Sequence, residues 1–358
     1  MQARRNWENM RYCLLVISAA LLLLAFWLCL KPAPAPEREE QQDGLVLWTE
    51  PVQHIFFHSL ILYPEHLFRR VQDNDLLIKL YKDNFVTHRE FERILPQLFE
   101  RGYVLYCISE VFSRDNDAGA EMRQNEIWLP EGKKPLIISI DDPSYHYGSG
   151  FANRIILDEN GILATEVITP AGQTIVTYDG DVSLVIDNFV QKNPEFSFRG
   201  ARGIIATTGY LGFMGYKLDT EDSREKAKAV ANKYKENGWL FANHSYYHRR
   251  HWFLGDGGCA ERITYDTKKW KEVIEPIVGE TNLYVAPFGY LLEGAAFEVI
   301  LANGYDIYFD VVLQQRIFVH ERFALMGRVQ IDGLGMRFNR TVLDALFFDV
   351  DSVKDRHR

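Results

Sequence analysis

The chain has 358 residues, of which 47% are hydrophobic and 25% charged, the composition of a globular protein with one large α/β unit or about two domains. A mean hydropathy of −0.19, with a single apolar run long enough to span a bilayer, excludes a polytopic membrane protein and a disordered chain. The net charge is −9 with no cluster of basic residues beyond the N-terminus, so nucleic acid is not an expected partner, and four cysteines are too few for a disulfide scaffold.

The first apolar run extends from Tyr12 to Leu30 and contains no charged residue. Its nineteen residues approach the ~20 that a helix needs to cross the ~30 Å hydrocarbon core of a bilayer. Arginines precede it, which places residues 1–11 in the cytoplasm and the chain that follows outside. We therefore predict a transmembrane signal-anchor over residues 12–30. The alternative is a cleaved signal peptide, but its apolar core would be shorter, and the small-residue site Ala33-Pro34-Ala35 is followed by a proline.

Residues 31–44 are predicted to form a Pro/Glu-rich linker, and residues 45–358 one domain of alternating strand-like and helical patterns. Expected strands cover Val52–Phe57, Tyr103–Ile108, Leu136–Ile140, Gly203–Thr208, Trp239–Ala242, Leu283–Ala286, Ile307–Phe309 and Arg328–Ile331. Expected helices cover Arg89–Arg101, Ser223–Asn237, Asp266–Ile277 and Glu293–Asn303. This alternation predicts a βα-built parallel sheet or barrel. The exception is Arg154–Tyr178, whose alternating pattern around turn sequences predicts a β-hairpin insertion.

Polar residues directly after these strands are the candidates for function, because the carboxyl ends of parallel strands gather at one side of the fold. Asp141 and Asp142 follow one apolar strand, where adjacent acids also suit an ordinary turn or helix cap. His244 and His248 follow another strand. An i,i+4 pair on a helical turn places both imidazoles on one face, as in divalent-metal sites, although this spacing also occurs without a metal.

A third strand end carries Pro287-Phe288-Gly289-Tyr290, a turn whose backbone N–H groups could face a ligand, or an ordinary loop. The combination of strand ends is more informative than each alone. One carboxylate and two imidazoles at successive strand ends predict a three-ligand metal site with positions open to water, which is the catalytic type of site.

Three segments in this order, Ser139-Ile140-Asp141-Asp142, His244-Ser245-x-x-His248 and Ala286-Pro287-Phe288-Gly289, carry a family resemblance. Over about residues 52–331 the chain resembles the polysaccharide deacetylases of carbohydrate esterase family 4, the NodB-homology domain. The resemblance implies an α/β fold, a distorted (β/α) barrel, that binds a divalent cation and removes acetyl groups from N-acetylated sugars. Zn²⁺ is the expected cation, and a His₂Asp ligand set also accepts Co²⁺, Ni²⁺ or Fe²⁺.

The resemblance also implies roles for single residues. Asp142, His244 and His248 would bind the metal, and Asp141 would be the general base. The backbone N–H of Phe288 would stabilise the oxyanion that forms at the attacked acetyl carbonyl. Amide hydrolysis at neutral pH needs an activated water, which a metal and a neighbouring carboxylate together provide.

The chain departs from the family at two functional positions. Val285 stands where the family carries the Arg that orients the base, and the late Leu-x-His that supplies the general acid has no clear match near residues 325–329. Arg328 is a candidate to replace the missing Arg, and His320 is a candidate for the acid. His58, at the end of the first expected strand, could enter the same cleft or line the core.

Aromatic rings stack on sugar rings, so Tyr145, Trp252 and Tyr290, together with His58, are expected to contact an N-acetylated polysaccharide, although core packing also explains such rings. The expected function is that of a membrane-anchored, metal-dependent N-deacetylase acting outside the cytoplasm on a cell-surface or cell-wall polysaccharide. Two alternatives stay open: a catalytically inactive glycan-binding relative, which Val285 and the missing late His favour, and a metallo-hydrolase of another amide or ester. The sequence indicates no oligomeric state.

Overall fold

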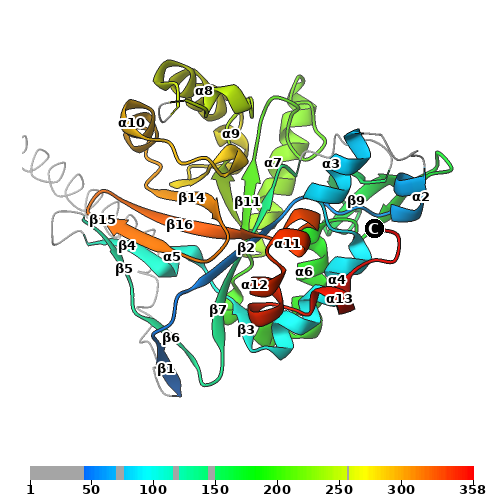
Figure 1. Ribbon diagram of the computed structural model, residues 1–358. Helices are drawn as coiled ribbons and strands as arrows, with labels where there is room; N and C mark the ends of the chain where they lie inside the picture. The colour runs from blue at the N-terminus through cyan, green and yellow to red at the C-terminus, as the bar shows by residue number, and fades with distance from the viewer. Residues whose placement is uncertain (1–43, 70–75, 116–120, 144–149, 256–257) are drawn as a thin grey trace, which may run out of the picture. The chain divides into compact units, whose positions relative to one another are not determined.

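The computed structural model describes residues 44–358 except 70–75, 116–120, 144–149 and 256–257 (Figure 1). The predicted membrane segment and Tyr145 lie outside the described residues, as does the linker except Gly44. Among the helices of the described part of the chain, none is both long and apolar enough to cross a membrane.

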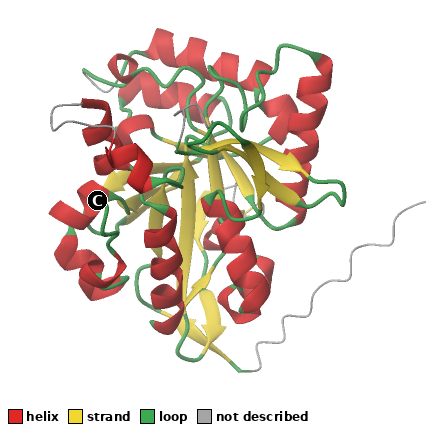
Figure 2. Ribbon diagram, turned by 90° about the vertical axis from the view of Figure 1, so that its right-hand side faces the viewer, coloured by secondary structure: helices red, strands yellow, loops and turns green. Residues whose placement is uncertain are grey.

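Parallel strands form the centre of the fold, with helices packed around them (Figure 2). The central strands are β2 Gln53–Phe57, β7 Lys134–Asp141, β11 Ile204–Thr207, β12 Leu240–Asn243, β13 Leu283–Val285, β14 Ile307–Val312 and β16 Phe323–Gln330. They pair in the order β11-β12-β13-β14-β16-β2-β7, and β7 also pairs with β11. The ring therefore closes, and the prediction of a (β/α) barrel is confirmed for the described residues, with seven strands in the ring.

The strands bury different residues on their two faces, because side chains alternate along a strand. In β7, Ile138 and Ile140 pack in the apolar cluster that includes the surrounding helices, whereas Ile137 packs in a second cluster built largely from the ring strands. Ser139 and Asp141 share the face of Ile137 and are buried as well. The ring is therefore apolar toward the amino ends of its strands and polar toward their carboxyl ends.

The four predicted helices are present, and the structure adds others that the sequence analysis did not predict. The longer ones are α3 Leu76–Asn84, α4 His88–Glu100, α6 Val182–Lys192, α7 Glu221–Glu236, α8 Ala260–Val273 and α10 Gly294–Ala302; the shorter ones are α2 Pro64–Arg69, α5 Ile108–Val111, α9 Glu275–Val278, α11 Gly333–Phe338, α12 Arg340–Leu346 and α13 Val350–Val353. The helix expected over residues 266–277 begins earlier, at Ala260, and is interrupted before Pro276, because proline cannot continue the hydrogen-bond ladder. The strand expected over residues 103–108 ends early, and α5 begins at Ile108.

Smaller sheets flank the ring. β3 Tyr103–Leu105 adds to β7 in parallel, and antiparallel pairs are formed by β1 Leu45–Trp48 with β6 Ile127–Pro130, β4 Phe112–Asp115 with β5 Glu121–Gln124, and β15 Ile317–His320 with β16. The predicted insertion is a three-stranded antiparallel sheet of β8 Ala152–Leu157, β9 Leu163–Ile168 and β10 Thr174–Thr177. Both turns lie where the sequence predicted them, so the insertion is a meander rather than a single hairpin.

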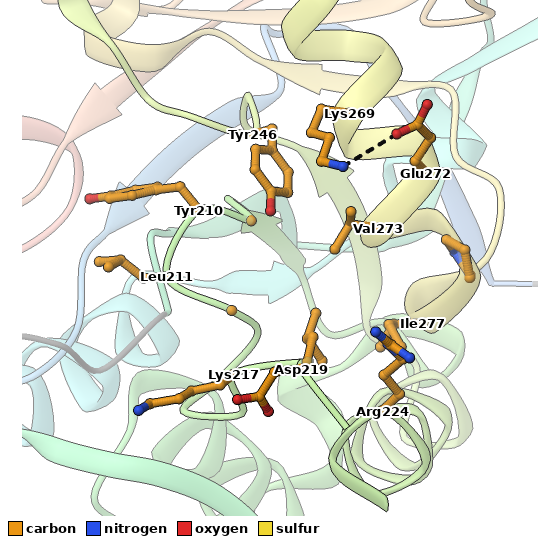
Figure 3. Close-up of a pocket in the computed structure, with 14 residues that line it drawn as sticks. Tyr210, Leu211, Lys217, Asp219, Arg224, Tyr246, Lys269, Glu272, Val273 and Ile277 are labelled. Atoms are coloured by element: carbon orange, nitrogen blue, oxygen red, sulfur yellow. Dashed lines mark hydrogen bonds and ion pairs between the residues drawn. The ribbon is translucent and has the colours of Figure 1, made fainter. Parts of the chain in front are cut away.

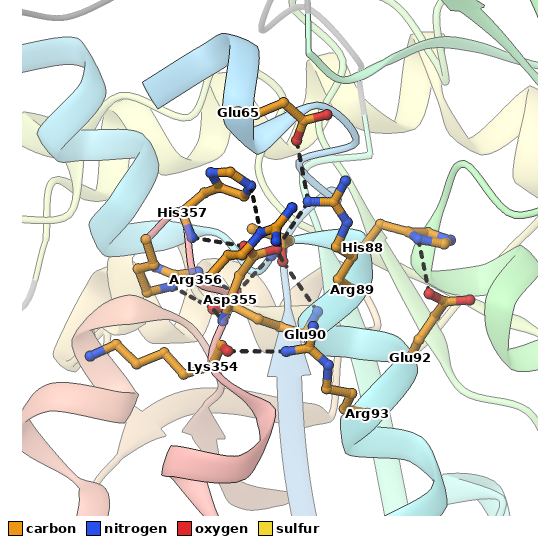
Figure 4. Close-up of polar contacts among 12 residues, drawn as sticks. Glu65, His88, Arg89, Glu90, Glu92, Arg93, Lys354, Asp355, Arg356 and His357 are labelled. Atoms are coloured by element: carbon orange, nitrogen blue, oxygen red, sulfur yellow. Dashed lines mark hydrogen bonds and ion pairs between the residues drawn. The ribbon is translucent and has the colours of Figure 1, made fainter. Parts of the chain in front are cut away.

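The C-terminal tail is attached to the start of α4 by a cluster of charges (Figure 4). The carboxylate of Glu90, buried in α4, accepts from Nη2 of Arg358 at 2.6 Å and from the backbone N–H of Asp355 at 3.0 Å. Arg358 also donates to the backbone carbonyls of Lys82 and Phe85. Each buried charge in this cluster has a partner, which is the condition for burying it without a large loss of stability.

Candidate active site

The predicted metal ligands meet at the carboxyl ends of two ring strands. Asp142 directly follows β7, and His244 directly follows β12. Nε2 of His248 lies 3.5 Å from Oδ2 of Asp142, and Nε2 of His244 lies 3.9 Å from the same oxygen. One ligand atom from each of the three residues lies within 4.8 Å of the others. The structure therefore brings together the three side chains that the motifs had indicated.

The donor set suits a divalent cation. Nδ1 of His244 lies 2.8 Å from the carbonyl oxygen of Val285, to which it donates, so Nε2 is left unprotonated on the side of Asp142. A backbone carbonyl on the other ring nitrogen is a common way to orient a metal-binding histidine. Burial lowers the pKa of His244, against the opposite effect of the two neighbouring aspartates, so the imidazole is neutral at neutral pH, as metal binding requires.

The two histidines lie on an irregular loop, not on the helical turn that their spacing had predicted. Their ring centroids are 5.0 Å apart. Ser245 and His248 have φ angles of 66° and 50°, and Asp142 has a φ of 52°. Residues other than glycine in this left-handed region cost about 1–3 kcal/mol each and persist where the surroundings hold them. The site geometry is therefore imposed by neighbouring groups.

Asp266, a buried residue of α8, holds this loop. Its carboxylate accepts from the Ser245 hydroxyl at 3.0 Å and from the backbone N–H groups of Tyr246 and Tyr247, each at 2.9 Å. The Ser245 hydroxyl in turn accepts from the backbone N–H of His248 at 3.0 Å. Sequence reasoning did not identify Asp266, because it is twenty residues away from the loop and its pattern is that of an ordinary helix.

Asp141, beside the ligand set, is paired with a buried arginine. Nη1 and Nη2 of Arg328 donate to its two carboxylate oxygens at 2.6 and 2.9 Å. Arg328 comes from β16 and passes β2, where its guanidinium lies 4.2 Å from the ring centroid of Phe56. Burial alone would raise the pKa of Asp141, but the charge and hydrogen bonds of Arg328 hold it well below its usual range. Asp141 is therefore ionised at neutral pH.

A further buried pair supports Arg328 inside the ring. Nη1 of Arg328 donates to the hydroxyl of Ser139 at 3.0 Å, and this hydroxyl lies 3.0 Å from Nε2 of His54. Burial and the charge of Arg328 lower the pKa of His54 well below its ordinary value, so this histidine is neutral. Nη1 of Arg328 therefore donates to both Ser139 and Asp141.

His58 lies at the same level of the barrel as Asp141. Phe57 is paired with Ile140, so the next residues, His58 and Asp141, fall side by side on adjacent strands. On the other side of β2, Asp332 follows β16; burial raises the pKa of Asp332 to about 6, and the charge of His58 is among the smaller opposing effects. Among the described residues, Nδ1 of His58 is buried without a hydrogen-bond partner. His58 therefore belongs to the polar end of the ring.

His320, predicted as a candidate acid, lies at the opposite end of the barrel. It ends β15 and pairs with Phe323, the first residue of β16, on which its ring is stacked at 4.9 Å. Five residues of strand, roughly 16 Å, separate Phe323 from Arg328. The prediction for His320 is wrong, because the turn between β15 and β16 is at the amino end of a ring strand, away from the metal ligands.

Phe288, predicted to donate its backbone N–H, and the predicted substrate-contacting rings of Tyr290 and Trp252 lie at different distances from the ligands. The ring of Phe288 is 46% exposed and its centroid lies 4.3 Å from that of His248. Its backbone has a φ of 58°. The ring centroids of Tyr290 and Phe288 are 6.2 Å apart. The Tyr290 hydroxyl accepts hydrogen bonds from the Arg250 guanidinium at 2.9 and 3.1 Å. The ring of Trp252 packs on that of Tyr247, which lies between His244 and His248 in the sequence, with the two ring centroids 5.4 Å apart.

No protein-family model matches the chain, and no curated protein matches it in sequence. Among solved structures, a Streptococcus pyogenes deacetylase, PplD, in complex with acetate is similar at 12% identity and a TM-score of 0.45, covering 84% of this chain and 99% of that one. A de-N-acetylase from Aggregatibacter actinomycetemcomitans is similar at 12% identity and a TM-score of 0.47, over 79% and 96% of the two chains. The BpsB deacetylase domain from Bordetella bronchiseptica is similar at 12% identity and a TM-score of 0.38, over 78% and 97%.

Proposed function

We propose that this protein is a divalent-metal-dependent deacetylase that hydrolyses N-acetyl groups of a polysaccharide. The observation that carries the proposal is the meeting of Asp142, His244 and His248 beside a second carboxylate, Asp141, which Arg328 holds. Three ligands leave coordination positions for water and substrate, whereas a structural zinc site is closed by four. A second carboxylate that binds no metal in this arrangement is available for acid–base chemistry.

The roles of the chain's own residues follow from their positions. Asp142, His244 and His248 would hold the cation, which lowers the pKa of a water and polarises the acetyl carbonyl. Asp141, ionised beside Arg328, accepts the proton of the attacking water. Arg328 positions this carboxylate through both of its oxygens and prevents it from turning toward the cation.

The second half of the reaction needs a donor to the leaving nitrogen and a donor to the oxyanion. His58 is the candidate proton donor, because its strand position places it beside Asp141 at the polar end of the ring. The backbone N–H of Phe288, next to His248, would donate to the oxyanion. Phe288 and Tyr290 would contact the sugar through their rings. These assignments replace His320 as the acid.

The cellular setting is part of the proposal. The uncharged residues 12–30, preceded by arginines, support a membrane anchor with the catalytic domain outside the cytoplasm. A cell-surface or cell-wall polysaccharide is then the substrate, and Zn²⁺ the expected cation for a His₂Asp set.

The proposal is tested on the full chain by measuring bound metal and acetate release from N-acetylglucosamine oligomers. We expect bound metal in the wild type and acetate release that Asp141→Asn and His244→Ala abolish. His320→Ala is a matched control, since its imidazole lies at the other end of the barrel, and it should retain activity. Bound metal without acetate release from any oligomer would instead favour a glycan-binding protein. A chain that binds no metal would refute the proposal.

A further inference from the structure

A pocket of about 670 Å³ lies beside Tyr246 of the loop that carries His244 and His248 (Figure 3). Its walls come from the segment after β11, from the start of α7, and from the last turns of α8 with α9. None of the metal ligands, and neither Asp141 nor His58, is among the residues that line it. The volume falls within the ~300–1,000 Å³ of typical ligand pockets.

The pocket and the ligand loop share a wall. The carbonyl oxygen of Tyr246 accepts from the backbone N–H groups of Gly209 and Tyr210 at 3.1 and 2.9 Å. A Cβ at Gly209 would lie 2.3 Å from the Tyr246 ring, so glycine permits this close approach. Because Asp266 holds Tyr246 and the loop that carries His248, a ligand in the pocket would rest on the same rigid unit as the metal ligands.

Tyr210 connects the two sites. It lines the pocket, and half of its surface is exposed. Its backbone N–H donates to the carbonyl oxygen of Tyr246, in the loop that carries His244 and His248. Tyr210 therefore lies on the wall that the pocket shares with this loop, where a chain molecule that extends from the metal site into the pocket would pass.

The lining is chemically suited to a sugar. The lining combines apolar groups, among them Val273, Ile277 and the Tyr246 ring, with charged side chains, here called the rim. The rim residues are Lys217, Asp219, Arg224, Lys269 and Glu272. The rim carries cations and anions in nearly equal number, so it offers hydrogen-bond donors and acceptors to hydroxyl groups without selecting an ion. A pyranose ring presents an apolar face of C–H groups and a rim of hydroxyls, and thus complements this lining.

We infer that this pocket is a second sugar-binding subsite, which takes one or more units of the same polysaccharide while another unit lies at the metal. This inference rests on the proposed function, because it assigns the substrate of that site as a polymer held at two points. Two linked contacts raise the apparent affinity through effective concentration. The length of the sugar chain, rather than the acetylated unit alone, then determines binding.

The test compares N-acetylglucosamine oligomers of one to six units, in β-1,4 and β-1,6 linkage, with the full chain. For the wild type we expect KM to fall about tenfold or more from the monomer to the longer oligomers. Val273→Trp, which fills the pocket, should remove most of this decrease. A double variant, Lys217→Ala with Arg224→Ala, changes only exposed side chains and should reduce the decrease without a risk to folding. Lys228→Ala, on the same helix as Arg224 but outside the lining, is the control and should behave as the wild type.

Calorimetric titration of each protein with the hexamers separates this inference from the proposed function. If the wild type binds hexamers about tenfold more tightly than Val273→Trp but releases no acetate, the pocket binds sugar and the proposed deacetylase activity is refuted. If acetate is released with the same KM for all lengths, or if KM decreases with length equally in every variant, the pocket is not a sugar subsite. The proposed deacetylase activity would still be supported. A wild type that neither binds nor hydrolyses either series would overturn both.

Discussion

Replacing Arg328 with Met tests the centre of the proposed site. The guanidinium has no exposed surface and donates to both oxygens of Asp141 and to Ser139. Methionine is an unbranched apolar side chain, so the substitution leaves the Asp141 carboxylate buried without the guanidinium that pairs with it. Removing one partner of a buried ion pair costs about 3–5 kcal/mol. With an unfolding entropy of roughly 2.1 cal/mol/K per residue over residues 44–358, this loss corresponds to a decrease in Tm of roughly 5–8 °C.

The same variant should change how stability depends on pH. In the wild type the folded-state pKa of Asp141 lies below the unfolded value, so its contribution is present above that value and is lost as pH falls. Without Arg328, burial raises the folded-state pKa, and the contribution is then lost as pH rises. The difference in unfolding free energy between wild type and Arg328→Met should therefore be larger at pH 7 than at pH 4.

Urea denaturation at pH 4 and pH 7, with acetate release as the second readout, checks these expectations. Arg337→Met is the matched control, because Arg337 is half exposed in its pair with Asp83, and it should change stability by less than about 0.5 kcal/mol. The double variant with Asp141→Asn removes both buried charges and should regain part of the lost stability while it stays inactive. Equal stability of Arg328→Met and wild type, or a loss that is the same at both pH values, would refute the reasoning.

Three other outcomes can be measured on the same protein. Zn²⁺ added to chelator-treated chain should raise the free energy of unfolding by about 2.7 kcal/mol at a concentration of 100 Kd, and His248→Ala should abolish this increase in denaturation curves. Asp266→Ala removes the acceptor of three loop hydrogen bonds and should weaken metal affinity about 10–100-fold in a chelator competition, whereas Glu261→Gln, exposed on the same helix, should leave it unchanged. Burial raises the pKa of Asp332 to about 6, above its unfolded value, so its contribution to stability is complete below pH ~4 and is lost as pH rises through 6. Asp332→Asn, which can still cap α11, should therefore be more stable than wild type by about 3 kcal/mol at pH 8 and not at pH 4; equal urea midpoints at pH 8 would contradict this.

The parts of the site that the sequence predicted are those that depend on local pattern. A buried parallel strand reads as a continuous apolar run, so the end of Leu136–Ile140 could be located and the acids after it noticed. The two histidines share one loop, so their spacing was visible even though the loop is not helical. Because strand ends gather at one side of a parallel barrel, these local signals sufficed to bring the three ligands together.

The parts that the sequence did not predict depend on register and on the closing of the ring. Asp266 supports the ligand loop from a helix, and no spacing rule connects the two. His58 stands between Asp141 and Asp332 because three strands pair in one particular register. His320 was misplaced for the same reason, since a histidine near a strand does not reveal which end of the strand it occupies.

Arg328 supplies, from a different position in the sequence, the positive charge that the resemblance expects at position 285. The resemblance expects an arginine at position 285, on β13, where this chain has a buried valine whose carbonyl oxygen orients His244 instead. Arg328 enters from β16, and its register partner on β14 is Val311, so it faces the ring from a different strand. Every ring strand sends alternate side chains to the same interior, so a guanidinium from β16 can reach Asp141 across β2 as one from β13 could across the centre. The missing arginine therefore argues less for an inactive relative than the sequence alone suggested.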